Sequence, residues 1–151
     1  MVDLDLVVRD AIGQLEADIS TKHARVDLQG PFPRVCAHRA TLEQALANLV
    51  SNGLKFVPPG QPPQIQIRTE RSNGSVRVWV EDNGIGIDPV HHSRIFAVFE
   101  RLHQADQYAG TGIGLAIVRK AVERMGGRVG VESMPGSGSR FWIELQSAEA
   151  A

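Results

Sequence analysis

The first stretch of the chain carries apolar residues at intervals of three and four, from Leu4 to Ile19, with acidic residues between them. This spacing predicts one amphipathic helix of about five turns. Residues 24 to 29 then alternate between apolar and polar, which predicts a half-buried strand that a Gly-Pro pair ends. A short second strand is expected over residues 34 to 37.

Helical spacing returns twice more, and a hairpin follows each of these helices. The second helix is predicted from a capping box at Thr41 to Phe56, before a Pro-Pro-Gly run. Two strands then alternate on either side of an Asn-Gly pair that suits a hairpin turn. After a glycine-rich segment from 81 to 114, a third helix is expected from Leu115, followed by a last hairpin that ends near residue 145.

The predicted order is helix, two strands, helix, two strands, irregular segment, helix and two strands, with no internal repeat. Such an order predicts an α+β fold. We expect a two-layer α/β sandwich, in which three helices cover one face of a mixed, mostly antiparallel sheet of about five strands. One domain is expected over residues 1–146, with a loose tail over residues 147–151.

Composition narrows the class of protein. The chain has 151 residues, of which 42% are hydrophobic and 22% are charged, the balance of a soluble globular domain. A net charge of −1 gives no electrostatic argument for nucleic acid or an anionic membrane as a partner. No apolar run is long enough to span a bilayer, and acidic residues near the N-terminus argue against a signal peptide. The single cysteine, Cys36, is expected to be a small buried residue in a reducing, cytoplasmic setting.

Three polar residues fall on one face of the second predicted helix. Asn48, Asn52 and Lys55 are separated by four and three positions, the spacing of neighbours on a helix surface. Amide oxygens can coordinate Mg²⁺ and a lysine can neutralise phosphate, so these residues are a candidate metal and phosphate site. A solvated helix face explains the same residues and remains an open alternative.

Two glycine-bearing segments are further candidates. Asp82 follows a strand, where its carboxylate could accept a hydrogen bond from an exocyclic amine, and Gly84 and Gly86 let the backbone approach a flat ligand. A simple turn is the alternative there. The segment Gly110–Leu115 leads into a helix, and the amide groups and dipole of a helix N-terminus suit phosphates. It matches neither a dinucleotide fingerprint nor a P-loop.

The order and spacing of these segments resemble the catalytic and ATP-binding domain of sensor histidine kinases, members of the Bergerat-fold ATPase and kinase superfamily. The resemblance covers residues 4 to 145, and the stretch after Arg101 looks closest to phytochrome-type kinases. The matching segments are Asn48–Phe56 (N box), Asp82–Gly86 (G1 box), Ile95–Arg101 (F box), Gly110–Leu115 (G2 box) and the glycine hairpin Gly136–Phe141.

The resemblance implies ATP and Mg²⁺ as cofactors. It also indicates which residues would contact the phosphates and the metal. Asn52 would hold Mg²⁺, and Asn48 would support the metal and the phosphates. Lys55 and Arg101 would contact phosphate. Asn48, Lys55 and Arg101 are therefore the expected catalytic residues.

The base side follows from the same resemblance. Phe56 would pack along the adenine, and Asp82 would accept a hydrogen bond from its amino group. The remaining expected nucleotide contacts, which line the base pocket or shape the segment around the triphosphate, are Gly84, Gly86, Ile87, Gly110, Thr111, Gly112, Gly114 and Leu115.

The residue at position 48 bears on the reaction. ATPases of the superfamily have a water-activating glutamate there, whereas the amide of Asn48 cannot act as a general base near neutral pH. Phosphoryl transfer requires mainly alignment and charge neutralisation. The resemblance thus implies an ATP-dependent protein-histidine kinase domain of two-component signal transduction. A serine kinase of the anti-sigma-factor type, a degenerate nucleotide-binding module and a free-standing ATPase are the alternatives.

The expected partners lie outside this chain. None of the five histidines is followed by an acidic residue as the family's acceptor is, so we expect the acceptor on a separate dimerisation hairpin, with a response regulator downstream and a monomeric isolated domain. His38 stands where the family has an aspartate helix cap, and we expect the helix to begin later, at Thr41. Gly53 replaces a commoner alanine, and neither change is expected to affect a nucleotide contact.

Overall fold

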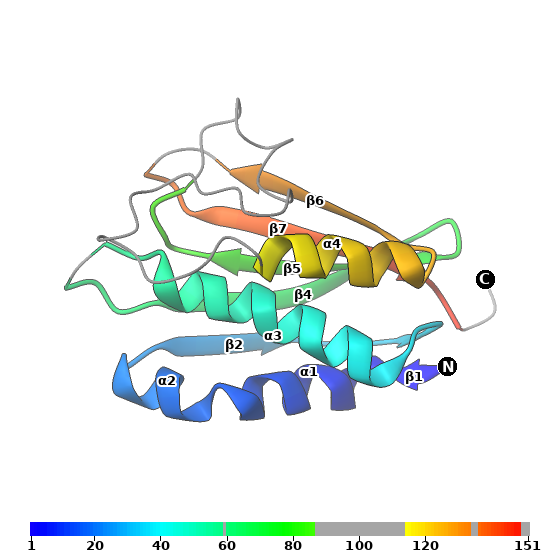
Figure 1. The fold of residues 1–151 in the computed structure, drawn as a ribbon, viewed down its shortest axis with the longest axis horizontal. Helices are drawn as coiled ribbons and strands as arrows, with labels where there is room; N and C mark the ends of the chain where they lie inside the picture. The colour runs from blue at the N-terminus through cyan, green and yellow to red at the C-terminus, as the bar shows by residue number, and fades with distance from the viewer. Residues whose placement is uncertain (59, 87–113, 134–135, 149–151) are drawn as a thin grey trace.

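A five-stranded sheet and a layer of helices make up the fold (Figure 1). The computed structural model describes residues 1–58, 60–86, 114–133 and 136–148. Along the chain the elements are β1 (Val2–Asp3), α1 (Leu4–Gln14), α2 (Glu16–Thr21), β2 (Arg25–Gln29), β3 (Arg34–Val35), α3 (Arg39–Lys55), β4 (Gln64–Ser72), β5 (Ser75–Asp82), α4 (Gly114–Arg124), β6 (Arg128–Ser133) and β7 (Ser139–Gln146).

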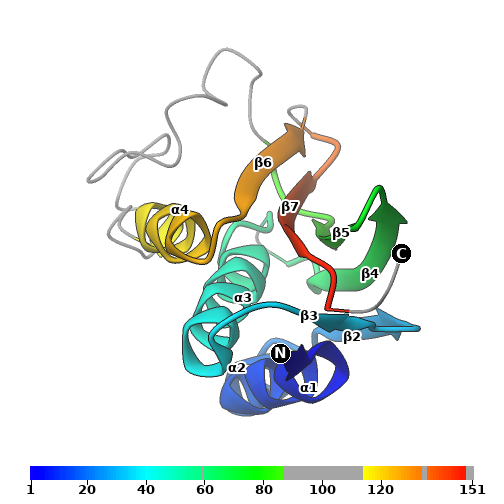
Figure 2. The same ribbon diagram turned by 90° about the vertical axis from the view of Figure 1, so that its right-hand side faces the viewer.

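The sheet has the strand order β2-β4-β5-β7-β6, and a separate pair is formed by β1 and β3. Within the sheet, β2 and β4 are parallel and the other neighbours are antiparallel. Figure 2 shows α1, α3 and α4 on the same side of the curved sheet. The predicted α+β class, with a mixed and mostly antiparallel sheet of five strands, is confirmed.

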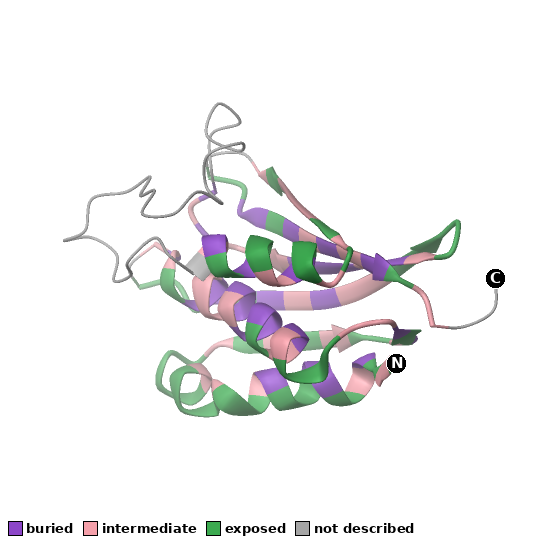
Figure 3. Ribbon diagram, turned by 45° about the vertical axis from the view of Figure 1, so that its right-hand side comes forward, coloured by how far each residue is buried: buried purple, intermediate pink, exposed green. Residues whose placement is uncertain are grey.

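Alternation along the strands and helical spacing along α3 bury one continuous core (Figure 3). Val76, Val78 and Val80 of β5 point toward the helices and are at most 1% exposed. Leu46 and Leu49 of α3 pack into the same core, and each such side chain contributes about 1.5–3 kcal/mol through burial. The core therefore fixes α3 against the middle of the sheet, which determines where the end of that helix lies.

The predicted hairpin turn between β4 and β5 is confirmed. Asn73 and Gly74 both have positive φ, 50° and 81°, as a type I′ turn requires. The single helix predicted from Leu4 to Ile19 is wrong, because the chain turns at Leu15 and forms α1 and α2. Leu15 donates its N–H to the carbonyl of Ile12 at 3.0 Å, a tighter i to i−3 bond that ends the regular helix.

The start of α3 also differs from the prediction. The helix begins at Arg39, and the His38 side chain is its cap: Nδ1 accepts a hydrogen bond from the N–H of Thr41 at 3.3 Å. The hydroxyl of Thr41 lies 2.8 Å from the same nitrogen. The expectation that losing the aspartate cap delays the helix to Thr41 is therefore wrong, because an imidazole nitrogen takes over the acceptor role.

The start of the C-terminal tail is hydrogen-bonded, and Cys36 is less buried than predicted. Ser147 and Ala148 donate their N–H groups to the carbonyls of Gly74 at 2.8 Å and Arg34 at 3.0 Å, so the first two residues of the predicted loose tail are bonded. Cys36 is half-buried rather than buried, with its Sγ 3.9 Å from the carbonyl of Ser147. No helix among the described residues is long and apolar enough to cross a bilayer.

The sheet face opposite the helices carries its own layer of arginine, tryptophan and glutamate side chains. The guanidinium groups of Arg68 and Arg140 lie 5.2 and 4.7 Å from the ring centre of Trp79, within cation–π range. Both arginines also pair with Glu81. Trp79 is only 4% exposed as a result, and its buried indole N–H has no partner among the described atoms.

Candidate functional site

The polar stripe predicted on the second helix lies on α3, along the side that the core does not cover. Asn48 and Asn52 are half-buried and Lys55 is exposed in the last turn. Gln44 Nε2 lies 3.4 Å from Asn48 Oδ1, a long hydrogen bond. Among the described residues, no side chain bonds to the amide of Asn52. The stripe is therefore a row of available polar groups that ends where α3 ends.

The end of α3 is tied to its surroundings on two sides. Lys22 Nζ donates to the carbonyl of Leu54 at 3.0 Å, where a positive charge complements the helix dipole. Phe56 caps the helix, and its carbonyl accepts the N–H of Ile85 at 2.9 Å. A Cβ at Gly84 would lie 2.3 Å from this same carbonyl oxygen, so only glycine allows the approach. The N box and G1 box segments are thus brought into direct contact.

Asp82 lies at the end of β5 beside this junction. Its Oδ1 accepts the N–H of Gly84 at 2.9 Å and the N–H of Ser139 at 3.1 Å. Burial raises the pKa of the carboxyl from 3.8 to about 6, and the two backbone hydrogen bonds oppose that rise. Asp82 is consequently ionised at neutral pH, but at a cost in desolvation. A perturbed carboxylate of this kind is typical of a binding site.

Gly53 also contributes to the position of Asp82, contrary to the expectation from the sequence. A Cβ at Gly53 would lie 3.3 Å from Cβ of Asp82 and 3.1 Å from Cδ1 of Ile65. The lack of a side chain lets α3 pack closely on the ends of β4 and β5. The substitution of glycine for alanine therefore affects the neighbourhood of a predicted nucleotide contact.

Two further residues make hydrogen bonds near Asp82, and the sequence analysis assigned no role to either. Asn83 Oδ1 accepts the N–H of Gln64 at 2.8 Å, and its Nδ2 donates to the carbonyl of Pro62 at 3.1 Å, which fixes the approach to β4. Ser139, at the start of β7, supplies an N–H to Asp82 and is only 5% exposed. The signal for Ser139 was present in the Gly136–Phe141 match, which predicted no contact for it.

The last described part of the predicted site is the start of α4. The helix begins at Gly114, and Leu115 is half-buried against the core. In Figure 1 this helix start lies at the same end of the sandwich as the end of α3, the end of β5 and the start of β7. Five predicted contacts lie outside the described residues: Ile87, Arg101, Gly110, Thr111 and Gly112.

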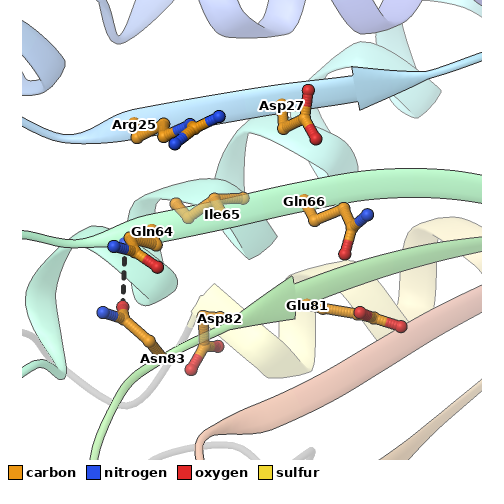
Figure 4. A pocket seen from close by; sticks show the side chains of 8 residues that line it. All are labelled: Arg25, Asp27, Gln64, Ile65, Gln66, Glu81, Asp82 and Asn83. Carbon is orange, nitrogen blue, oxygen red and sulfur yellow. Dashed lines mark hydrogen bonds between the residues drawn. The ribbon is translucent and has the colours of Figure 1, made fainter.

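A separate open hollow of about 290 Å³ lies where β2, β4 and β5 adjoin (Figure 4). Of the described residues predicted for the site, Asp82 alone lines it. The other lining residues are mostly polar side chains of the sheet face that the helices leave uncovered, so the hollow is not the place where α3 meets β5. They are Arg25, Asp27, Gln64, Ile65, Gln66, Glu81 and Asn83.

The residues present fit a metal ion that is bound mainly by substrate phosphates and by few protein side chains. No group of three His, Cys, Asp or Glu side chains comes together in the described ranges, so this part of the chain offers no all-protein metal cage. The half-buried amide of Asn52 offers an oxygen without a described partner. Mg²⁺ commonly keeps several waters and is bound by few protein oxygens together with substrate phosphates.

Comparison with known proteins adds to this geometry. Residues 37–149 match the family described as "Histidine kinase-, DNA gyrase B-, and HSP90-like ATPase". The phytochrome-like protein Cph1 of Synechocystis sp. is 41% identical over 143 residues, which are 95% of this chain and 19% of that protein. The chain thus spans about a fifth of the length of that relative.

Two solved structures are similar in fold and sequence. Full-length ShkA in complex with AMPPNP superimposes with a TM-score of 0.81 at 32% identity, over 99% of this chain and 31% of that one. The catalytic domain of histidine kinase ThkA in a nucleotide-free form superimposes with a TM-score of 0.79 at 28% identity, over 97% of this chain and 93% of that one. The two-layer sandwich described above is therefore the Bergerat fold of histidine kinase catalytic domains.

Proposed function

The chain belongs to the family of histidine kinase-, DNA gyrase B- and HSP90-like ATPases, and we propose that it binds ATP with Mg²⁺ and donates the γ-phosphoryl group to a histidine on a separate helical hairpin. The same proposal places it in a cytoplasmic two-component pathway, with a response regulator downstream. The relatives include the sensor histidine kinase AruS, of which this chain covers 16%, and ShkA is described in complex with AMPPNP, an ATP analogue.

One observation carries the proposal: the polar side of α3 and the half-buried carboxylate of Asp82 meet at one end of the sandwich. Gly84 lies against the carbonyl of Phe56, and Ile85 donates its N–H to the same carbonyl, so the two segments are in direct contact. Asn48, Asn52 and Lys55 then offer amide and ammonium groups on one side, while Asp82 offers an acceptor on the other. A nucleotide requires such a division between phosphate and base.

The roles of the residues follow from their chemistry. Asp82 would accept a hydrogen bond from the amino group of adenine through Oδ2, because Oδ1 already accepts two backbone N–H groups. Asn52 would bind the metal with its amide oxygen, Asn48 would hold the phosphates beside it, and Lys55 would offset phosphate charge. The bound Mg²⁺ would neutralise charge on the phosphate oxygens.

Position 48 supports transfer to a delivered nucleophile over hydrolysis. The amide of Asn48 has no basic lone pair with which to activate water. Among the described residues near the site, Asp82 is the only carboxylate that the predicted contacts include, and its Oδ1 is occupied by backbone donors. A nucleotide would therefore remain intact until an acceptor is presented.

The metal role of Asn52 can be tested by calorimetric titration of the chain with ATP, with and without Mg²⁺. We expect Mg²⁺ to strengthen ATP binding by the wild type and to have little effect on Asn52→Ala. Ser51→Ala, next to it on α3, serves as the matched control and should behave as the wild type. An Asn52→Ala variant that keeps the full effect of Mg²⁺ would refute the assignment.

The acceptor can be identified by chemistry. The chain is incubated with γ-labelled Mg-ATP and either a helical hairpin that carries a histidine followed by an acidic residue or a serine-containing substrate of the anti-sigma-factor type. A phosphohistidine is lost in acid, whereas a phosphoserine survives. We expect an acid-labile label on the hairpin, and steady ATP hydrolysis by the chain without an acceptor would contradict the proposal.

A further inference from the structure

The end of the β6–β7 hairpin is pressed against Asp82. Gly138 has a φ of 76°, and a Cβ there would lie 2.1 Å from the carbonyl oxygen of Asp82. Gly136 donates its N–H to the carbonyl of Ile85 at 2.7 Å. The next residue after Gly138, Ser139, donates its N–H to Asp82 Oδ1 at 3.1 Å. The hairpin thus contacts the segment from Asp82 to Ile85, which would face the base.

Ser133, at the end of β6, closes this arrangement with its hydroxyl. Its Oγ donates to the carbonyl of Gly138 at 2.9 Å and lies 2.8 Å from Oγ of Ser139. A hydroxyl has one proton, and that of Ser133 goes to the carbonyl, which can only accept. The proton of Ser139 must therefore point to Ser133. The hydroxyl of Ser133 therefore holds both Gly138 and Ser139, the two residues joined by the peptide group whose N–H is donated to Asp82.

We propose that Ser133 is a positioning residue for base recognition: by holding Gly138 and Ser139, it aims the Ser139 N–H at Oδ1 of Asp82 and leaves Oδ2 to face the amino group of adenine. This inference rests on the proposed function and extends it to a residue on β6 to which the sequence analysis assigned no role. Guanine has a carbonyl oxygen where adenine has its amino group, so a fixed carboxylate favours ATP over GTP.

The neighbours of Asp82 make its titration a direct readout of this contact. Gly53 of α3, Ile65 of β4 and Ser139 of β7 pack against it or pair with it, and none carries a titratable side chain. Glu81 and Arg140, adjacent in the strands, belong to the uncovered sheet face, where they pair with each other at 3.2 Å. The Ser139 N–H lowers the Asp82 pKa, so its displacement would raise that pKa.

The test uses the full chain with three variants: Ser133→Ala, Ser133→Thr and, as the matched control, Ser137→Ala at an exposed position of the same hairpin. The Asp82 pKa is measured from the pH dependence of its carboxyl ¹³C shift without nucleotide. ATP and GTP affinities are measured by calorimetry at pH 8. We expect Ser133→Ala to raise the pKa and reduce the ATP to GTP preference about tenfold, the loss of one charge-assisted hydrogen bond.

Ser133→Thr keeps a hydroxyl and should restore both values, and Ser137→Ala should change neither. If Ser133→Ala lowers the melting temperature but leaves the pKa and the base preference of the wild type, Ser133 is only structural and the inference is wrong. If Ser133→Ala does not fold, the inference is tested on the wild-type chain by NMR titration. The amide shifts of Ser139 and Gly84 must then titrate together with the Asp82 carboxyl, and independent titration refutes the inference.

Failure of the proposed function would give a different result. A wild-type chain that binds neither ATP nor GTP removes the kinase proposal and the role of Ser133 in base selection with it. A chain that binds ATP while Ser133→Ala matches the wild type in pKa and preference removes the role of Ser133 alone.

Discussion

Replacing Asp82 by asparagine should stabilise the fold at neutral pH while it removes base recognition. The folded-state pKa of about 6, against 3.8 in a free carboxyl, means that ionised Asp82 is less stable in the folded chain than in water. A difference of about two units corresponds to roughly 3 kcal/mol. Asparagine keeps an oxygen that can accept from Gly84 and Ser139, so we expect Asp82→Asn to gain about 1–3 kcal/mol at pH 7.5.

The sign of the pH dependence follows from the direction of the shift. The folded pKa of Asp82 is raised, so its protonated form contributes stability that is fully present below pH 3.8 and is lost as pH rises through about 6. The amide side chain that Asp82→Asn introduces does not titrate. The stability difference between variant and wild type should therefore be smallest near pH 4, grow between pH 4 and 6, and stay constant above pH 7.

The measurement is urea unfolding at several pH values, followed by the fluorescence of Trp79 and Trp142. Asp27→Asn, an exposed carboxylate on β2, removes the same charge without the burial and should stay within about 0.5 kcal/mol of the wild type. ATP titration should show weaker binding for Asp82→Asn. An Asp82→Asn chain that is less stable at pH 7.5, or a difference that does not change from pH 4 to 7, would refute the reasoning.

Two further predictions concern the scaffold. His38→Asp should stabilise the chain by about 0.5–1 kcal/mol at neutral pH, because a carboxylate is a better cap for α3 and complements its dipole; urea unfolding would show this as a higher midpoint, and a lower midpoint would contradict it. Trp79→Phe should change stability by no more than about 1 kcal/mol, since it removes a buried N–H that has no partner among the described atoms. Trp79→Ala should lose about 3–5 kcal/mol in the same assay, and an equal loss for Trp79→Phe would contradict this expectation.

Local patterns predicted most of the secondary structure, because burial on one face forces a fixed spacing. The valines of β5 and the leucines of α3 alternate or recur as the sandwich requires, and the Asn-Gly turn follows from the positive φ values that those two residues tolerate. The break at Leu15 was missed, since the residues after it keep a helical pattern that ends up largely exposed. Periodicity alone does not show whether the apolar face of a predicted helix packs against another element.

The candidate site, too, was predictable from the sequence only in part. The sequence by itself determined which residue types are present: amides and an ammonium group on one face of α3, an aspartate after a strand, and glycines in the order that the family shares. Only the tertiary structure decided that Gly84 meets the carbonyl of Phe56, that Gly53 lies against Asp82, and that Ser139 donates to a carboxylate 57 residues away. Those contacts join distant segments, and their energies depend on burial and distance. Spacing along a chain contains neither, so the pKa of Asp82 and the role proposed for Ser133 emerge only once the strands are packed.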